Sequence, residues 1–121
     1  PVRISLDRDV DMQITGHRHA FRAKYKAGAT KDGKLVGMDV TLYNNAGCSL
    51  ELSSAVMDRA LFSIDNCYSW PALRVKGLVC KTNQASHTAF RGFGGPQGML
   101  VTETVMDHLA SSLEMDSFDL R

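Results

Sequence analysis

The stretch FRAKYKAGA, residues 21–29, alternates apolar and cationic side chains over its first seven positions. A period of two predicts a β-strand with one buried and one exposed face. The segment Thr30–Lys34 follows, where an Asp-Gly pair suits a tight turn, and alternation resumes from Val36 to Leu42. The three segments together predict an antiparallel hairpin.

Further strands and a helix are predicted on either side of this hairpin. Val2–Leu6 alternates apolar and polar residues, and Leu73–Cys80 is rich in β-branched and apolar side chains, so both are expected to be extended. A helix is predicted from about Ser54 to Ile64, with Ser53 or Ser54 as its N-cap and Asp65-Asn66 as its end.

The clearest helix signal lies toward the C-terminus. Gly94-Gly95 precede Pro96, a residue suited to the first helical turn, and apolar residues then recur at helical spacing as far as Leu113. The segment Met115–Arg121 predicts a cap followed by the first residues of another helix. These patterns predict one α+β unit, with an antiparallel hairpin, short strands and two main helices.

The composition is typical of one soluble globular domain, with 44% hydrophobic and 22% charged residues among 121. Fourteen Lys and Arg residues against 13 Asp and Glu residues give a net charge of +1, which is too small to hold a nucleic acid or an anionic membrane. No apolar stretch approaches the roughly 20 residues that a bilayer span needs. We therefore expect no nucleic-acid partner and no membrane partner.

The three cysteines, Cys48, Cys67 and Cys80, show no Cys-x-x-Cys spacing. This argues against a disulfide framework and against a structural zinc site, and it favours a reducing, intracellular setting. Because the chain starts at Pro1 and no signal segment follows, we expect a piece of a longer protein.

The segment Thr88–Gln97, TAFRGFGGPQ, is the most unusual part of the sequence because it places three glycines and two phenylalanines before a helix. Glycines let a backbone approach a ligand closely, and a helix that begins at Pro96 directs free N–H groups toward the loop. An anionic or polar cofactor is the expected occupant, with Arg91 as a hydrogen-bond donor. The alternative is a tight turn that the rings of Phe90 and Phe93 merely anchor.

Arg59 has no acidic residue three or four positions away on its predicted helix. Its guanidinium must therefore find solvent, a distant carboxylate or a ligand. His17 and His19 share a face if their segment is extended, but two ligands without a third make a poor metal site. Polar packing is the preferred interpretation, and no metal site is predicted. His87 and His108 are expected to belong to no cluster of chemical groups.

The segment Thr82–Gly98 closely resembles the active-site loop of xanthine dehydrogenases and oxidases, which are molybdenum hydroxylases. The resemblance extends over the whole chain, through Leu6–Met12, Thr15–His19, Tyr43-Asn44-Asn45 and Met57–Phe62. It implies that residues 1–121 are a fragment of the molybdenum cofactor-binding domain, truncated at both ends. Alone, the fragment is expected to be inactive.

The resemblance also implies the surroundings of this fragment in the full-length enzyme. Two 2Fe-2S clusters, FAD and NAD would be bound outside these residues, and molybdenum-molybdopterin would be contacted by them. A homodimer is expected, in the cytoplasm or alternatively in the peroxisome. The reaction implied is the oxidation of xanthine and hypoxanthine toward urate, by hydroxylation of a ring carbon with oxygen that originates from water.

Site residues are carried over by position. Arg59 matches the arginine that orients the substrate and stabilises negative charge in the transition state, and Phe93 matches the ring that stacks on the flat purine. The other matched positions are Ala89 and Phe90 at the substrate and Arg91, Phe90 and Gly92 at the cofactor.

The presence of Arg59 favours a purine substrate, since relatives that oxidise aldehydes typically lack an arginine at this position. An aldehyde oxidase of the same architecture is the nearest alternative. An alternative of another class is a non-catalytic binding or structural module, in which the glycine loop is only a turn.

Overall fold

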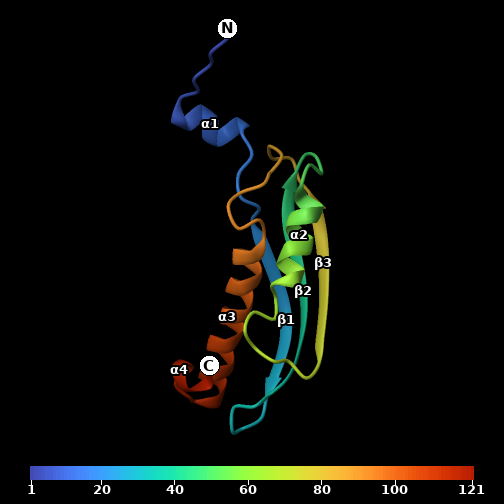
Figure 1. The fold of residues 1–121 in the computed structure, drawn as a ribbon, viewed down its shortest axis with the longest axis vertical. Helices are drawn as coiled ribbons and strands as arrows, with labels where there is room; N and C mark the ends of the chain where they lie inside the picture. Colours follow the sequence, from blue (N-terminus) through green and yellow to red (C-terminus); the bar gives the residue numbers. More distant parts are fainter.

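A three-stranded sheet and two long helices on one of its faces make up most of the chain, which the computed structural model describes from residue 1 to 121 (Figure 1). The sheet has the order β1-β2-β3, with β1 and β2 antiparallel and β2 and β3 parallel. The elements are, in chain order, α1 (Arg8–Ile14), β1 (Phe21–Ala29), β2 (Leu35–Gly47), α2 (Ser53–Phe62), β3 (Leu73–Lys81), α3 (Gly95–Leu113) and α4 (Ser117–Leu120).

The predicted hairpin is confirmed. Tyr25 pairs with Val40 across β1 and β2, and Gly33 in the connecting turn has a φ of 86°, a conformation that favours glycine. The strand β2 is longer than predicted and continues to Gly47. The predicted strand near Leu73 is also confirmed, and α2 forms the crossover that allows β3 to run parallel to β2.

The core lies between the sheet and the two helices. Alternate residues of β2 point into it, and α2 packs on β2 and β3 while α3 packs on β1 and α2. The buried residues of this core are Met38, Val40, Leu42, Met57, Ala60, Ile64 and Val105. Burial of these apolar side chains is the main favourable term that holds α2 and α3 against the sheet.

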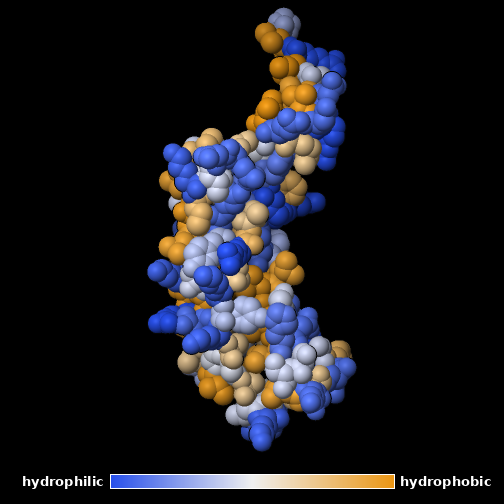
Figure 2. Space-filling model, turned by 180° about the vertical axis from the view of Figure 1, so that it is seen from behind, coloured by the Kyte–Doolittle hydropathy of each residue, from blue (hydrophilic) through white to orange (hydrophobic).

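The opposite face of the sheet is covered by no helix and carries exposed cations from β1 and β3. Figure 2 views the molecule from behind and shows hydrophilic side chains spread over this side, with apolar ones between them. Arg74 pairs with Asp39 there, and Lys24 lies 5.9 Å from the ring centre of Tyr43. No helix of the structure combines the length and the apolar character that a membrane crossing requires.

The prediction of a strand at Val2–Leu6 is wrong. This segment has no regular structure, and Val2 and Ile4 are 99% and 83% exposed, because no neighbouring strand offers a hydrogen-bonding partner. The helix α1 that follows was not predicted. It is seven residues long and buries no side chain, and Asp9 and Asp11 in its first turn complement the helix dipole.

The helix α2 is confirmed, but its predicted N-cap is wrong. Leu52 occupies the N-cap position, and no side chain caps the helix. The hydroxyl of Ser53 instead forms a 2.7 Å hydrogen bond with Nε2 of His19, and its carbonyl accepts from Asn44. The Ser53 hydroxyl is therefore engaged in a tertiary contact and does not cap α2.

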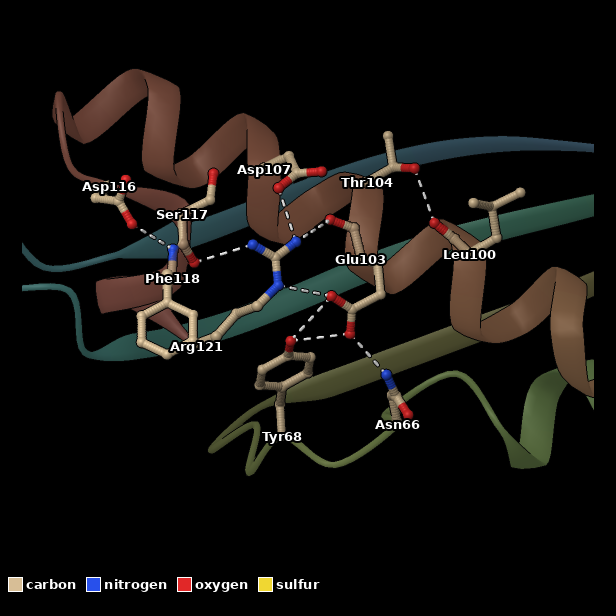
Figure 3. A network of polar contacts seen from close by, with 10 residues as sticks. All are labelled: Asn66, Tyr68, Leu100, Glu103, Thr104, Asp107, Asp116, Ser117, Phe118 and Arg121. Carbon is tan, nitrogen blue, oxygen red and sulfur yellow. Dashed lines mark hydrogen bonds and ion pairs between the residues drawn. The ribbon is translucent and has the colours of Figure 1, made fainter.

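At the C-terminal end, the predicted cap and helix start are confirmed, since Asp116 accepts a hydrogen bond from the Phe118 N–H at the start of α4. Figure 3 shows how α4 is fastened to α3. Arg121 donates to Glu103 at 2.8 Å and to Asp107 at 2.7 Å, and Glu103 also accepts from Asn66 and Tyr68.

The electrostatics of this network follow from its contacts. The hydrogen bond from Arg121 holds the pKa of Glu103 below its usual value. Burial, together with the neighbouring Glu103 carboxylate, raises the pKa of Tyr68 to about 12. The Glu103 side chain is partly buried within this network.

Candidate functional site

The loop between β3 and α3 contains three consecutive residues in the left-handed region of backbone space. Gly92 and Gly94 have φ angles of 90° and 94°, and Phe93 between them has a φ of 51°. Two short-range hydrogen bonds close the turn, from the N–H of Phe93 to the carbonyl of Phe90 and from the N–H of Gly95 to that of Gly92. A side chain in this region costs about 1–2 kcal/mol, so Phe93 marks a strained position that is typical of functional sites.

The glycines of this loop serve its close packing against α2. A Cβ atom at Gly94 would lie 2.0 Å from the carbonyl oxygen of Val56, and one at Gly98 would lie 2.5 Å from that of Ala60. A Cβ atom at Gly92 would lie 2.5 Å from the ring of Pro96. The absence of side chains thus lets the start of α3 lie directly on α2.

This packing brings Arg59 to the loop. Arg59 lies on the exposed side of α2, and its Nε is 3.8 Å from the place where a Cβ of Gly95 would be. It forms no ion pair in the chain, so the alternative of a tertiary salt bridge is wrong for these 121 residues. Arg59 and the strained Phe93 turn therefore meet at the junction of α2 and α3.

The other predicted site residues lie on the surface of the same loop. Ala89, Arg91 and Gly92 are exposed, and Phe90 is 56% exposed. Phe93 is half-buried and lines a crevice that is too narrow for a water molecule, so these residues alone enclose no ligand-sized cavity.

Two residues at this loop were not predicted to belong to the site. Arg18 donates from Nη2 to the carbonyl of Arg91 at 2.6 Å, and its guanidinium lies 4.4 Å from the ring centre of Phe90. Gln97 donates from Nε2 to the carbonyl of His19 at 3.3 Å. Both residues lie in the sequence motifs that resemble the family, and no other feature of the sequence indicated that they belong to the site.

Each of these two side chains has one buried atom without a hydrogen-bond partner, Nη1 of Arg18 and Oε1 of Gln97. Both residues line the crevice beside Phe93. The backbone N–H groups of Gly92, which is exposed, and of Gly94, which is buried, form no backbone hydrogen bond within the chain. Because α3 is long enough to direct a positive dipole end at this loop, the exposed surface of the loop suits a polar or anionic ligand.

The histidines are arranged differently from the prediction. His87, expected to stand alone, lies between His17 and His19, with ring centres 6.3 and 5.9 Å away, and its Nδ1 accepts from the N–H of His17. Burial lowers the pKa of His19 and of His87, and each is further lowered by a neighbouring histidine. His108, also expected alone, contacts the hydroxyl of Tyr25. No three His, Cys, Asp or Glu side chains lie close enough to hold a metal ion.

Comparison with known proteins identifies the family. The model of the molybdopterin cofactor-binding domain matches residues 1–121. The chain is 53% identical to xanthine dehydrogenase 1 of Arabidopsis thaliana over 121 residues, which are 100% of this chain and 9% of that protein. Its identity to xanthine dehydrogenase/oxidase of Felis catus is also 53%, with the same coverage of both chains.

Comparison with solved structures leads to the same family. Aldehyde oxidoreductase from Desulfovibrio gigas superposes with a TM-score of 0.80 at 34% identity, over 87% of this chain and 12% of that one. CO dehydrogenase from Oligotropha carboxidovorans gives a TM-score of 0.76 at 27% identity, over 96% of this chain and 15% of that one. The chain thus spans about a tenth of the length of its relatives. It belongs to the molybdopterin cofactor-binding domain family of the molybdenum hydroxylases.

Proposed function

We propose that this chain is part of an oxidoreductase that hydroxylates xanthine and hypoxanthine toward urate. The similarity to xanthine dehydrogenases over the whole chain supports this substrate class. The observation that carries the proposal is the unpaired Arg59 beside the strained Phe93 turn, since a guanidinium without a carboxylate is free to bind a ligand.

The residues at the loop fit a molybdopterin cofactor. The N–H group of the exposed Gly92, just before the N-terminus of α3, can donate to its anionic and carbonyl oxygens, and Arg91 and Phe90 are exposed beside it. We assign Arg91, Phe90 and Gly92 as cofactor contacts. When bound, the cofactor supplies the redox centre that takes up two electrons from the substrate.

In this proposal, Arg59 is the catalytic residue of the chain. Its guanidinium donates hydrogen bonds to an oxygen of the purine and stabilises the negative charge that develops on the heterocycle, which lowers the barrier more than it strengthens substrate binding. Phe93 presents its ring to the flat substrate, and Ala89 and Phe90 line the same pocket. Residues elsewhere in the longer protein complete this pocket.

The experiment that tests the proposal compares substrates on the purified full-length protein. We expect molybdenum to be present and xanthine to be turned over faster than simple aldehydes. Faster turnover of aldehydes would instead favour an aldehyde oxidase, the second candidate, which the similarity to aldehyde oxidoreductase from Desulfovibrio gigas supports. Absence of molybdenum, together with absence of iron-sulfur and flavin absorbance, would favour a non-catalytic module.

The remaining features of the full-length enzyme are proposed from the same resemblance. They are 2Fe-2S clusters, FAD and NAD outside residues 1–121, a homodimeric assembly, and a cytoplasmic location with the peroxisome as the alternative. Absorbance spectra, the mass of the native protein and cell fractionation test them separately.

A further inference from the structure

The segment His17–His19 runs along the glycine loop and contacts it at three places. The carbonyl of His17 accepts from the N–H of Thr88 at 3.2 Å, near the start of the loop, and the carbonyl of His19 accepts from Gln97 at 3.3 Å, near its end. Between these two anchors, the side chain of Arg18 reaches the centre of the loop. The loop is therefore held at both ends and in the middle by three consecutive residues.

The guanidinium of Arg18 acts on three neighbouring loop residues. It lies over the ring of Phe90 at 4.4 Å, it donates to the carbonyl of Arg91 at 2.6 Å, and its Nη1 lies 3.9 Å from the place where a Cβ of Gly92 would be. A planar guanidinium can lie over a ring and donate from several nitrogens at once, whereas the lysine ammonium has a single nitrogen and no plane to stack. These contacts immediately precede the strained residue Phe93.

Strain at Phe93 requires that the surrounding structure hold the turn in place. Only two short-range hydrogen bonds close the turn from within, and Arg91 and Gly92 are exposed. Arg18 is the one side chain outside the loop that donates a hydrogen bond to residues 89–93. Its Nη1 is buried and has no partner, so the hydrogen bond from Nη2 to the loop is the one that Arg18 makes.

We propose that Arg18 is a positioning residue, which holds Phe90, Arg91 and Gly92 in the conformation that binds the cofactor. The inference rests on the proposed function for the identity of the ligand, and on the contacts above for the effect on the loop. Arg18 itself takes no part in the chemistry.

The test uses the full-length protein with Arg18→Met, Arg18→Lys and the control Arg22→Met. Arg22 is an exposed cation on β1 without a hydrogen bond or an ion pair. The control Arg22→Met therefore removes one positive charge, as Arg18→Met does, but removes no contact with the loop. Hydrogen exchange of the N–H groups of Phe93 and Gly95 reports whether the turn is closed, and metal analysis gives molybdenum per chain.

In Arg18→Met we expect about tenfold faster exchange at Phe93 and Gly95, as for the loss of a hydrogen bond that holds the turn, and less molybdenum per chain than in the wild type. Arg18→Lys keeps the charge and one donor nitrogen, so its exchange rates and molybdenum content should lie between those of Arg18→Met and the wild type. Arg22→Met should match the wild type in both the exchange rates and the molybdenum content.

Wild-type exchange and molybdenum content in Arg18→Met would overturn the inference, and so would equal losses in Arg22→Met. A wild-type protein without molybdenum would refute the proposed function instead. The exchange rates would then still decide whether Arg18 holds the loop.

Discussion

The two ends of α3 differ in how their polar groups are paired. At the C-terminal half, all three guanidinium nitrogens of Arg121 donate to acceptors, and the Glu103 carboxylate accepts from three side chains (Figure 3). At the N-terminal end, Arg18 and Gln97 each keep a buried polar atom without a partner, and Arg59 pairs with no carboxylate.

Under the proposed function, the C-terminal half of the helix stabilises the fold and the N-terminal end serves the cofactor and the substrate. An unpaired buried polar group costs about 1–3 kcal/mol, and the N-terminal end of α3 carries this cost at both Arg18 and Gln97. The strained backbone of Phe93 also lies at the N-terminal end of α3, and such strain is typical of functional sites. Substitutions of polar residues at the N-terminal end should therefore lower activity or cofactor content, whereas those in the paired network should lower stability.

The largest effect is expected for Arg59→Met in the full-length enzyme. Loss of one donor that acts in the transition state should lower xanthine turnover by roughly 10²–10³ while simple aldehydes are turned over as before. Asp58→Asn, an exposed neighbour on α2, serves as the control. Steady-state kinetics with both substrates checks this, and equal losses on xanthine and aldehydes would refute the assignment.

A large loss of stability is expected for Gly94→Ala. The added methyl group would meet the Val56 carbonyl at 2.0 Å in a left-handed conformation, so we expect the free energy of unfolding to fall by about 3 kcal/mol. Gly28→Ala is the matched control, because its Cβ would meet nothing within 4 Å. Thermal unfolding measures both, and similar midpoints for the two variants would contradict the close packing of α2 and α3.

At the paired end, Glu103→Gln should lower the free energy of unfolding by about 1 kcal/mol and leave cofactor content unchanged. Because Arg121 holds the pKa of Glu103 below 4.5, the ionised carboxylate stabilises the fold above about pH 4.5, and this contribution disappears as the pH falls through the lower folded-state value.

Unfolding measured between pH 7 and 3 should accordingly show a smaller acid dependence in Glu103→Gln than in the wild type. Asp119→Asn, on α4 and outside every ion pair, should keep the wild-type dependence. A loss of cofactor in Glu103→Gln would show that the two ends of α3 are not independent.

The smallest effect is expected for His87→Asn. Burial holds the pKa of His87 and of His19 below 6.5, so the folded state favours neutral rings and loses stability as the pH falls below 6.5. Removing one ring should reduce the decline in stability between pH 7 and 5 by roughly half. Denaturant unfolding at the two pH values tests this, and an unchanged decline would assign the dependence to other groups.

Local pattern predicted the hairpin, the strand near Leu73 and both main helices, because each buries one regular face against the core. It failed at Val2–Leu6, where alternation exists but no neighbouring strand pairs with it. It also missed α1, because a helix of seven residues spans too few turns for a periodic pattern to be recognised.

The residues of the candidate site likewise fall into those that the sequence could single out and those that it could not. Arg59 and Phe93 could be singled out from the chain alone, since a cation without helical partners and a ring within a glycine loop are local anomalies that matched a family motif. Arg18, Gln97 and His87 could not, because their partners lie 73, 78 and 70 positions away. Hydrogen bonds over such separations depend on how the sheet and helices pack, and no local periodicity encodes them.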